Sequence, residues 1–119
     1  MTGEDEPEPE GQTLNTLSDI LLRRYLLRDL LWCQPCDRRI VPILLRPASR
    51  YYACPSKACP HPALPARVIE YRVWSRFVRL YGTTAQGVPR ERRHDVLRQM
   101  LWRVVVGRNM TDLRCEWRA

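Results

Sequence analysis

The stretch CQPCDRRIVPILLRPASRYYACPSKAC, residues 33–59, holds four of the five cysteines of the chain. They form two close pairs, Cys33-x2-Cys36 and Cys54-x4-Cys59, with seventeen residues between the pairs. Each pair can offer two thiolates to one ion, and two pairs can close a tetrahedral shell of four sulfurs. Soft thiolates in this geometry favour zinc. The spacing predicts one structural Zn²⁺ ion, because four protein ligands leave no position open for water or substrate.

Other arrangements of these residues remain open at this stage. His61 could replace a cysteine ligand through the spacing Cys54-x6-His61, and the four cysteines could instead form two disulfides. A reducing compartment would favour metal ligation over disulfides. Cys115 lies in an alternating apolar segment near the end of the chain, and we interpret it as a small core residue and not as a ligand.

The segment around the cysteines is rich in proline, which indicates strands and turns. Six prolines in residues 32–62 argue against a helix there. The segments RRIVPILL (38–45) and SRYYA (49–53) are candidate strands, joined by a turn at RPAS. Pro42 is compatible with an edge strand or a bulge. Residues 32–62 are thus predicted to form a small zinc β-ribbon.

The flanking segments predict an α+β fold in one domain, residues 13–119, after a disordered acidic tail at 1–12. Apolar spacing predicts an N-terminal helix over 16–31 and two later helices over 65–81 and 90–103. Alternation of apolar and charged residues predicts a C-terminal β-hairpin over 104–118.

The charge of the chain points to a polyanionic partner. The 119 residues carry a formal net charge of +7, and the sequence pI is about 9.6. Double-stranded DNA is the first candidate partner for such a basic chain. An acidic N-terminus without an apolar run does not fit a signal peptide, and no apolar run is long enough to span a bilayer. A cytoplasmic protein without a membrane contact is expected.

Three segments resemble a known family. LLRDLLWCQPCDRRI, RYYACPSKAC and ARVIEYRVWSRFVRL look like the zinc β-ribbon region of large serine recombinases, the phage and transposon integrases. RRHDVLRQMLWRVVVG and LRCEW are similar to the terminal helix and last hairpin of these enzymes. The resemblance covers about two thirds of the chain and implies a DNA-binding module of mobile-element or regulatory character.

The chain also departs from the family pattern. Asp37 stands where the family usually has glycine, and GTTAQGVP stands where family members often carry a coiled-coil arm. No catalytic domain with a nucleophilic serine precedes Cys33, and Ser18, Ser49, Ser56 and Ser75 match no nucleophile motif. We therefore expect a protein that binds DNA and is not an enzyme.

Basic and aromatic side chains mark the expected DNA surface. Arginine binds phosphates in a bidentate way and reads guanine edges, and a two-stranded ribbon fits the major groove. The candidates on or near the ribbon are Arg38, Arg39, Arg46, Arg50, Tyr51 and Tyr52, and those on the next helix are Arg72, Arg76 and Arg79.

A second function class remains open. In this alternative, the chain is a protein-interaction adaptor in which zinc only holds the fold. The leucine-rich segment 16–31 would then dock a protein partner or a second copy of the chain. Salt-dependent DNA binding would distinguish the two classes, because phosphate contacts weaken steeply as salt rises.

Overall fold

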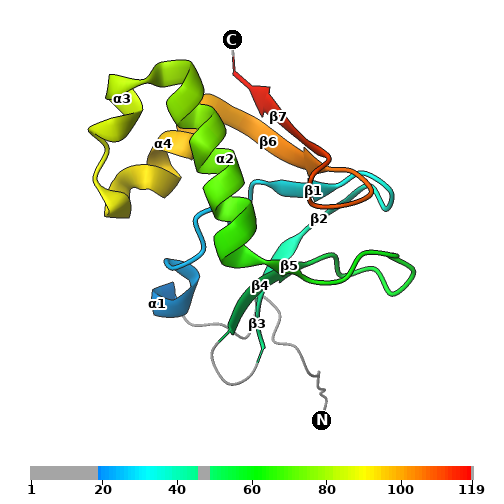
Figure 1. The fold of residues 1–119 in the computed structure, drawn as a ribbon. Helices are drawn as coiled ribbons and strands as arrows, with labels where there is room; N and C mark the ends of the chain where they lie inside the picture. Colours follow the sequence, from blue (N-terminus) through cyan, green and yellow to red (C-terminus); the bar gives the residue numbers. More distant parts are fainter. Residues whose placement is uncertain (1–18, 46–48, 119) are drawn as a thin grey trace.

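The computed structural model describes residues 19–45 and 49–118 of the chain. Helices and mixed sheets confirm the predicted α+β class (Figure 1). In chain order, the elements are α1 (Asp19–Leu22), β1 (Leu31–Cys33), β2 (Arg38–Arg39), β3 (Val41–Leu45), β4 (Ser49–Ala53), β5 (Leu64–Pro65), α2 (Ala66–Tyr81), α3 (Thr83–Gln86), the 3-10 helix η2 (Arg90–Arg92), α4 (Arg93–Met100), β6 (Leu101–Val106) and β7 (Leu113–Trp117).

The larger sheet has four strands in the order β2-β1-β6-β7. Its antiparallel strands β6 and β7 form the predicted C-terminal hairpin, although β6 begins at Leu101 and not at residue 104. The strands β1 and β6 pair in parallel, with Leu31 opposite Val104 and Cys33 opposite Val106. All four of these side chains are buried, so β1 carries the first cysteine into the core.

The smaller sheet has three strands in the order β3-β4-β5. The candidate strands 38–45 and 49–53 are confirmed as β2, β3 and β4, with a break at Ile40. Pro42 lies on the edge strand β3, where a missing N–H disrupts no inner ladder. Residues 46–48, which hold most of the expected RPAS turn, lie outside the described part of the chain.

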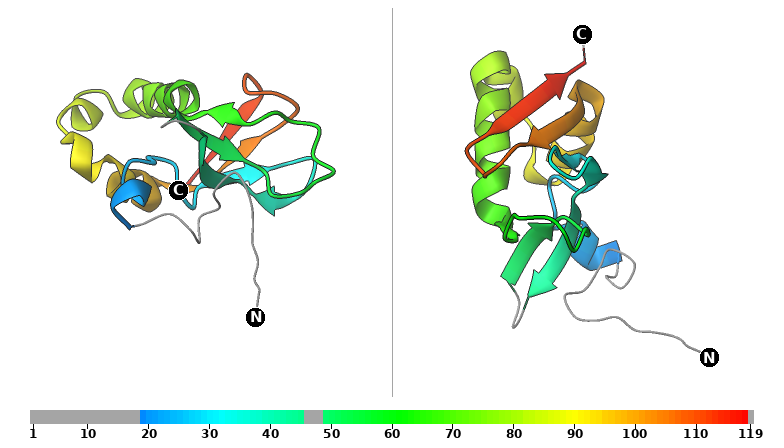
Figure 2. Two further views of the ribbon diagram at one scale, coloured as in Figure 1. Left: turned by 90° about the horizontal axis from the view of Figure 1, so that it is seen from below. Right: turned by 90° about the vertical axis from the view of Figure 1, so that its right-hand side faces the viewer.

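Helix α2 connects the two sheets. It runs beside both of them in two perpendicular views (Figures 1 and 2). One face buries Ile69, Val73 and Phe77 at helical spacing. Near its C-terminal end, the ring of Phe77 lies 6.0 Å from that of Trp117 on β7. The helix ends before Gly82, whose φ of 55° is easily adopted only without a side chain.

The prediction of one continuous helix over residues 16–31 is wrong in its described part. Helix α1 ends at Leu22, residues 23–30 form turns, and β1 begins at Leu31. Asp29 has a φ of 67°, which no right-handed helix contains. Residues 16–18 and the acidic tail at 1–12 lie outside the described residues.

Distant side chains explain why the helix stops. The backbone N–H of Leu26 donates to the carboxylate of Glu70 at 3.0 Å, and the N–H of Leu27 donates to the Tyr52 hydroxyl at 2.9 Å. These N–H groups therefore need no helical carbonyl partner. Leu27, Leu30 and Leu31 are buried in the core, and Leu21, Leu22 and Leu26 pack against it.

Two further boundaries differ from the sequence prediction. The helix expected over 90–103 consists of η2 and α4, and it ends at Met100 because the chain continues directly into β6. The segment GTTAQGVP, expected as a loop, contains the short helix α3. The helix expected over 65–81 is confirmed as α2, from Ala66 to Tyr81.

Candidate metal centre and nucleic-acid interface

The first two cysteines lie at the end of β1 and in the turn that follows it. Cys33 is the last residue of β1, and Cys36 lies in the turn before β2. The N–H of Gln34 donates to the carbonyl of Val106 at 2.9 Å, which fixes the start of this turn against β6. The turn closes through Asp37, whose φ is 52°.

The other two cysteines lie after β4 in the smaller sheet. Cys54 directly follows β4, and Cys59 lies in the loop before β5. Within that loop, the N–H of Cys59 donates to the carbonyl of Ser56 at 3.2 Å. The turn after β1 and the loop between β4 and β5 extend to the same side of the molecule (Figure 1). The two sheets thus each contribute one cysteine pair.

The four sulfur atoms form a compact cluster. The Sγ atoms of Cys33, Cys36, Cys54 and Cys59 all lie within 4.8 Å of one another. The Sγ atoms of Cys33 and Cys59 are 3.8 Å apart. In a tetrahedron with metal–sulfur distances of about 2.3 Å, the sulfurs are about 3.8 Å apart. The cluster could therefore hold one metal ion with little rearrangement.

The structure also decides between the alternatives that the spacing left open. All five cysteines are free thiols, so the two-disulfide arrangement is not formed. Among the described residues, the cluster contains four cysteines and no histidine, which leaves His61 outside it. Cys115 is half-buried on β7 and is likewise not part of the cluster.

Backbone amides act to lower the pKa of three of the four thiols. Hydrogen bonds of this kind stabilise thiolates and orient metal ligands. The donor and acceptor pairs are the N–H of Cys36 with Cys33, the N–H of Ser56 with Cys54, and the N–H of His61 with Cys59.

The thiols differ in their electrostatic setting. Burial raises the pKa of the Cys33 thiol to about 12, and burial also raises the pKa of Cys54. Burial acts in the same direction on Cys59, but the His61 amide and the neighbouring thiols outweigh it and lower the pKa of Cys59. A metal ion must displace these protons when it binds. Four sulfur donors fit a soft ion in a closed tetrahedral site.

The predicted DNA-binding residues on β2 are exposed. Arg38 and Arg39 form this short strand at the edge of the larger sheet. Arg39 pairs across the ladder with Trp32, and it meets Asp29 at 3.5 Å in an exposed ion pair. An exposed pair of this length contributes little stability, and both arginines are exposed, so both are accessible to a ligand. We call Arg38 and Arg39 the ribbon edge.

The arginines of α2 have different environments. Arg72 and Arg79 are exposed and seven residues apart, which places them on one side of the helix. We call this pair the outer face of α2. Arg76 is half-buried, and its Nη1 donates to the carbonyl of Leu113 at 2.7 Å. Arg76 therefore holds α2 against β7 and is not free to bind DNA.

The expectation that Tyr52 and Arg50 contact DNA needs correction. Tyr52 is 0% exposed, because its ring lies in the core and its hydroxyl donates to Glu70. Arg50 forms a bidentate ion pair with Glu70, with N–O distances of 2.9 and 3.0 Å. Tyr51 is half-buried, and Arg46 lies outside the described residues.

Sequence reasoning also missed two basic groupings. The guanidinium of Arg103 lies 5.2 Å from the ring centre of Trp32, next to the ribbon edge. Arg50 lines a groove together with arginines from three segments that are far apart in the chain. No local spacing predicts either grouping, because each depends on the tertiary fold.

Comparisons of the chain with protein-family models, curated proteins and solved structures find no match. The resemblance to serine recombinases therefore stays a prediction from the residues alone. No helix among the described residues has the length and apolar character to cross a membrane.

Proposed function

We propose that the chain is a non-catalytic DNA-binding protein whose strands are held by one structural zinc ion. The observation that carries this proposal is the four-sulfur cluster directly next to the ribbon edge: Cys33 pairs with Arg38 across the β1–β2 ladder. Four thiolates suit zinc and leave it no open coordination position, which favours a structural role. We place the protein in the cytoplasm, where thiols stay reduced.

The ribbon edge has the chemistry of a phosphate-binding surface. Arg38 and Arg39 are adjacent on a strand, and both side chains are exposed. Trp32 extends the same region with an aromatic ring, which contacts Arg103, a residue already paired with Glu116 at 2.8 Å. Arginine forks bind phosphate oxygens in a bidentate way, and a narrow strand pair fits a major groove. We propose this edge as the primary DNA contact and the outer face of α2 as a secondary one.

We propose that the protein binds DNA without cutting it. This follows the resemblance to the DNA-binding part of serine integrases, in which a separate domain carries the nucleophilic serine. We expect no nicking of supercoiled plasmid and no covalent protein–DNA adduct. A single seryl–DNA adduct formed by the purified chain would contradict this part of the proposal.

The adaptor alternative has less support. The adaptor function depends on exposed leucines of an N-terminal helix that can contact a partner. In the structure, Leu27, Leu30 and Leu31 are instead buried in the core. Within residues 19–31, Ile20 is the apolar side chain that is largely exposed, at 69%. A single exposed apolar residue is ordinary on a protein surface.

The test is the salt dependence of binding to a random-sequence DNA duplex, followed by fluorescence anisotropy. We expect the affinity to fall steeply between about 50 and 200 mM salt. The double variant Arg38→Ala/Arg39→Ala should bind more weakly and lower the logarithmic salt slope by about one unit per lost phosphate contact.

Two further double variants carry the same change in charge, one as a control and one as a test of the secondary contact. Arg23→Ala/Arg90→Ala removes the same charge far from the ribbon edge, and Arg72→Ala/Arg79→Ala removes it from the outer face of α2. If the α2 variant loses affinity while the ribbon variant does not, the ribbon edge is not the contact. Undetectable duplex binding at low salt would overturn the DNA proposal as a whole.

A further inference from the structure

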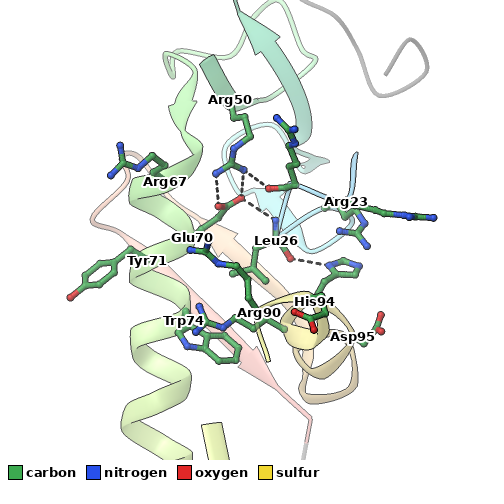
Figure 3. Close-up of a pocket in the computed structure, with 14 residues that line it drawn as sticks. Arg23, Leu26, Arg50, Arg67, Glu70, Tyr71, Trp74, Arg90, His94 and Asp95 are labelled. Carbon is green, nitrogen blue, oxygen red and sulfur yellow. Dashed lines mark hydrogen bonds and ion pairs between the residues drawn. The ribbon is translucent and has the colours of Figure 1, made fainter. Parts of the chain in front are cut away.

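A groove of about 860 Å³ lies between residues 23–28, α2 and the η2–α4 segment (Figure 3). This volume falls in the range of pockets that take small-molecule ligands. Seven arginines line the groove, against the three carboxylates of Glu70, Glu91 and Asp95. With His94 neutral, the lining carries a net charge of +4.

One arginine–carboxylate pair in the groove is internally satisfied. Glu70 accepts hydrogen bonds from Arg50, from the Tyr52 hydroxyl and from the backbone N–H of Leu26. The carboxylate of Glu70 thus has its partners within the protein, and its negative charge mainly neutralises Arg50 and not the other arginines of the groove. Figure 3 shows this pair beside the start of α2, with Arg67 and Arg23 extending to opposite sides of it.

Six further arginines line the groove beside Arg50. Within residues 19–45 and 49–118, none of them forms an ion pair at 4.0 Å or less. The cations of the lining outnumber its carboxylates, so on balance they repel one another, and a bound anion would relieve this repulsion. These residues are Arg23, Arg24, Arg28, Arg67, Arg90 and Arg93.

Arg93 carries a second, independent sign of a missing ligand. Its guanidinium lies 4.6 Å from the ring centre of Trp74, which holds the planar group in a defined orientation. Its Nε is buried and has no hydrogen-bond partner among the described residues. A buried N–H without an acceptor costs free energy, and such groups in native proteins call for an explanation. Arg93 also lines the groove, so an anion bound there could supply the acceptor if the guanidinium turns toward it.

We propose that this groove binds a ligand carrying two or more linked phosphate groups. Arginine forks match phosphate oxygens, and one phosphate monoester carries only about −1.5 to −2 at pH 7. A chain of phosphates is therefore needed to balance a charge of +4. Inorganic polyphosphate and the phosphate chain of a nucleotide share this chemistry. The site is separate from the ribbon edge, so the proposal does not depend on the proposed DNA contact.

The test is calorimetric titration of the full zinc-loaded chain with inorganic triphosphate at low salt. We expect saturable binding of one triphosphate per chain. Nucleoside triphosphate and citrate are titrated in parallel. Equal affinity for the two phosphate ligands assigns the site to the phosphate chain alone, and tighter nucleotide binding assigns it to a nucleotide. Citrate binding as tight as triphosphate would overturn the phosphate assignment.

Matched variants locate the binding. Arg23→Ala/Arg90→Ala removes exposed cations from two separate segments that line the groove and should weaken triphosphate binding at least about tenfold. Arg72→Ala/Arg79→Ala removes the same charge outside the groove and should change the affinity by less than about twofold. Equal losses in the two variants, or no loss in the first, would overturn the proposal.

A site-specific signal complements the variants. On triphosphate addition, the ¹⁵N Nε resonance of Arg93 should shift in the wild-type chain and in the Arg72→Ala/Arg79→Ala variant. A resonance that stays in place while triphosphate binds would overturn the role of this buried N–H.

Discussion

Asp37 shows how one residue shapes the first cysteine turn. Its φ of 52° lies in the left-handed region, which favours glycine. Aspartate tolerates this region better than most residues. The indole Nε1 of Trp32 donates to Asp37 Oδ1 at 3.0 Å. The carboxylate of Asp37 thus stabilises the turn, although a side chain at this φ also strains the backbone.

Replacing Asp37 should separate these two contributions. Asp37→Ala keeps the left-handed backbone but loses the acceptor, and it should lower the free energy of unfolding by about 1–2 kcal/mol. Asp37→Gly loses the same bond but relieves the strain, and it should lie within about 1 kcal/mol of the wild type. Urea unfolding of the zinc-loaded proteins measures both. An alanine variant more stable than the glycine variant would contradict the argument.

Glu70 joins three parts of the chain. Its carboxylate binds Arg50 and Tyr52 of β4 and the backbone N–H of Leu26, while Glu70 itself lies on α2. The side chain of Glu70 is 12% exposed and that of Arg50 is 22% exposed. Ion pairs this far from water are screened less than surface pairs, and losing one partner leaves the other charge without compensation.

Glu70→Ala should therefore be strongly destabilising. We expect a loss of about 3 kcal/mol in the free energy of unfolding, at the lower end of the range for breaking a buried ion pair. The double variant Glu70→Ala/Arg50→Ala should lose less than the sum of the single variants, because no unpaired charge remains. Glu116→Ala, which breaks a more exposed pair with Arg103, should have a much smaller effect. Additive losses would show that Arg50 and Glu70 are not coupled.

At the scale of elements, the contrast between residues 16–31 and 65–81 explains what a sequence pattern can predict. Both segments show apolar residues at helical spacing. In α2 this spacing forms one buried face, and the predicted helix is confirmed within one residue. In residues 23–31, Glu70 of α2 and Tyr52 of β4 accept hydrogen bonds from backbone N–H groups, and β1 pairs with β6. These partners are distant in sequence, so local periodicity cannot predict them.

His94 links α4 to this turn segment. Its Nδ1–H donates to the carbonyl of Leu26 at 2.9 Å, which fixes the neutral ring in one tautomer. Burial lowers the pKa of His94 below its usual 6.5, and Arg28 and Arg98 act in the same direction. The unfolded chain therefore binds a proton at a higher pH than the folded chain does.

The expected consequence is a loss of stability in acid. The contribution of neutral His94 is fully present above about pH 6.5 and is lost as the pH falls below this value. His94→Gln keeps a donor without a titratable group, so its stability should change less between about pH 7 and pH 5 than that of the wild type. Thermal unfolding measures the difference. Parallel pH profiles for the two proteins would show that His94 does not titrate differently on folding.

At the scale of the whole molecule, the site divides into a part that the sequence predicts and a part that it does not. The four cysteines could be predicted because each pair is local, and the structure brings the two pairs together. The groove could not be predicted, since residues 23–28, α2 and the η2–α4 segment meet only in the folded chain. Burial of Tyr52 likewise depends on packing between elements that are remote in sequence.

The cysteine cluster connects the two sheets, because each of the two cysteine-bearing segments contributes two of the four sulfurs. Cys33 belongs to the larger sheet, and Cys54 follows the central strand of the smaller one. Structural zinc contributes an apparent binding free energy of about 10–16 kcal/mol, which exceeds the stability of many small domains. Metal removal should therefore unfold the chain and not only loosen one loop.

Native mass spectrometry of the chain, purified in reducing buffer, measures whether the four cysteines hold zinc. We expect a folded species with one zinc ion per chain. Cys115→Ser should keep this stoichiometry, and Cys36→Ser should lower the zinc affinity or abolish folding. A chain that is folded, reduced and free of metal would contradict the account.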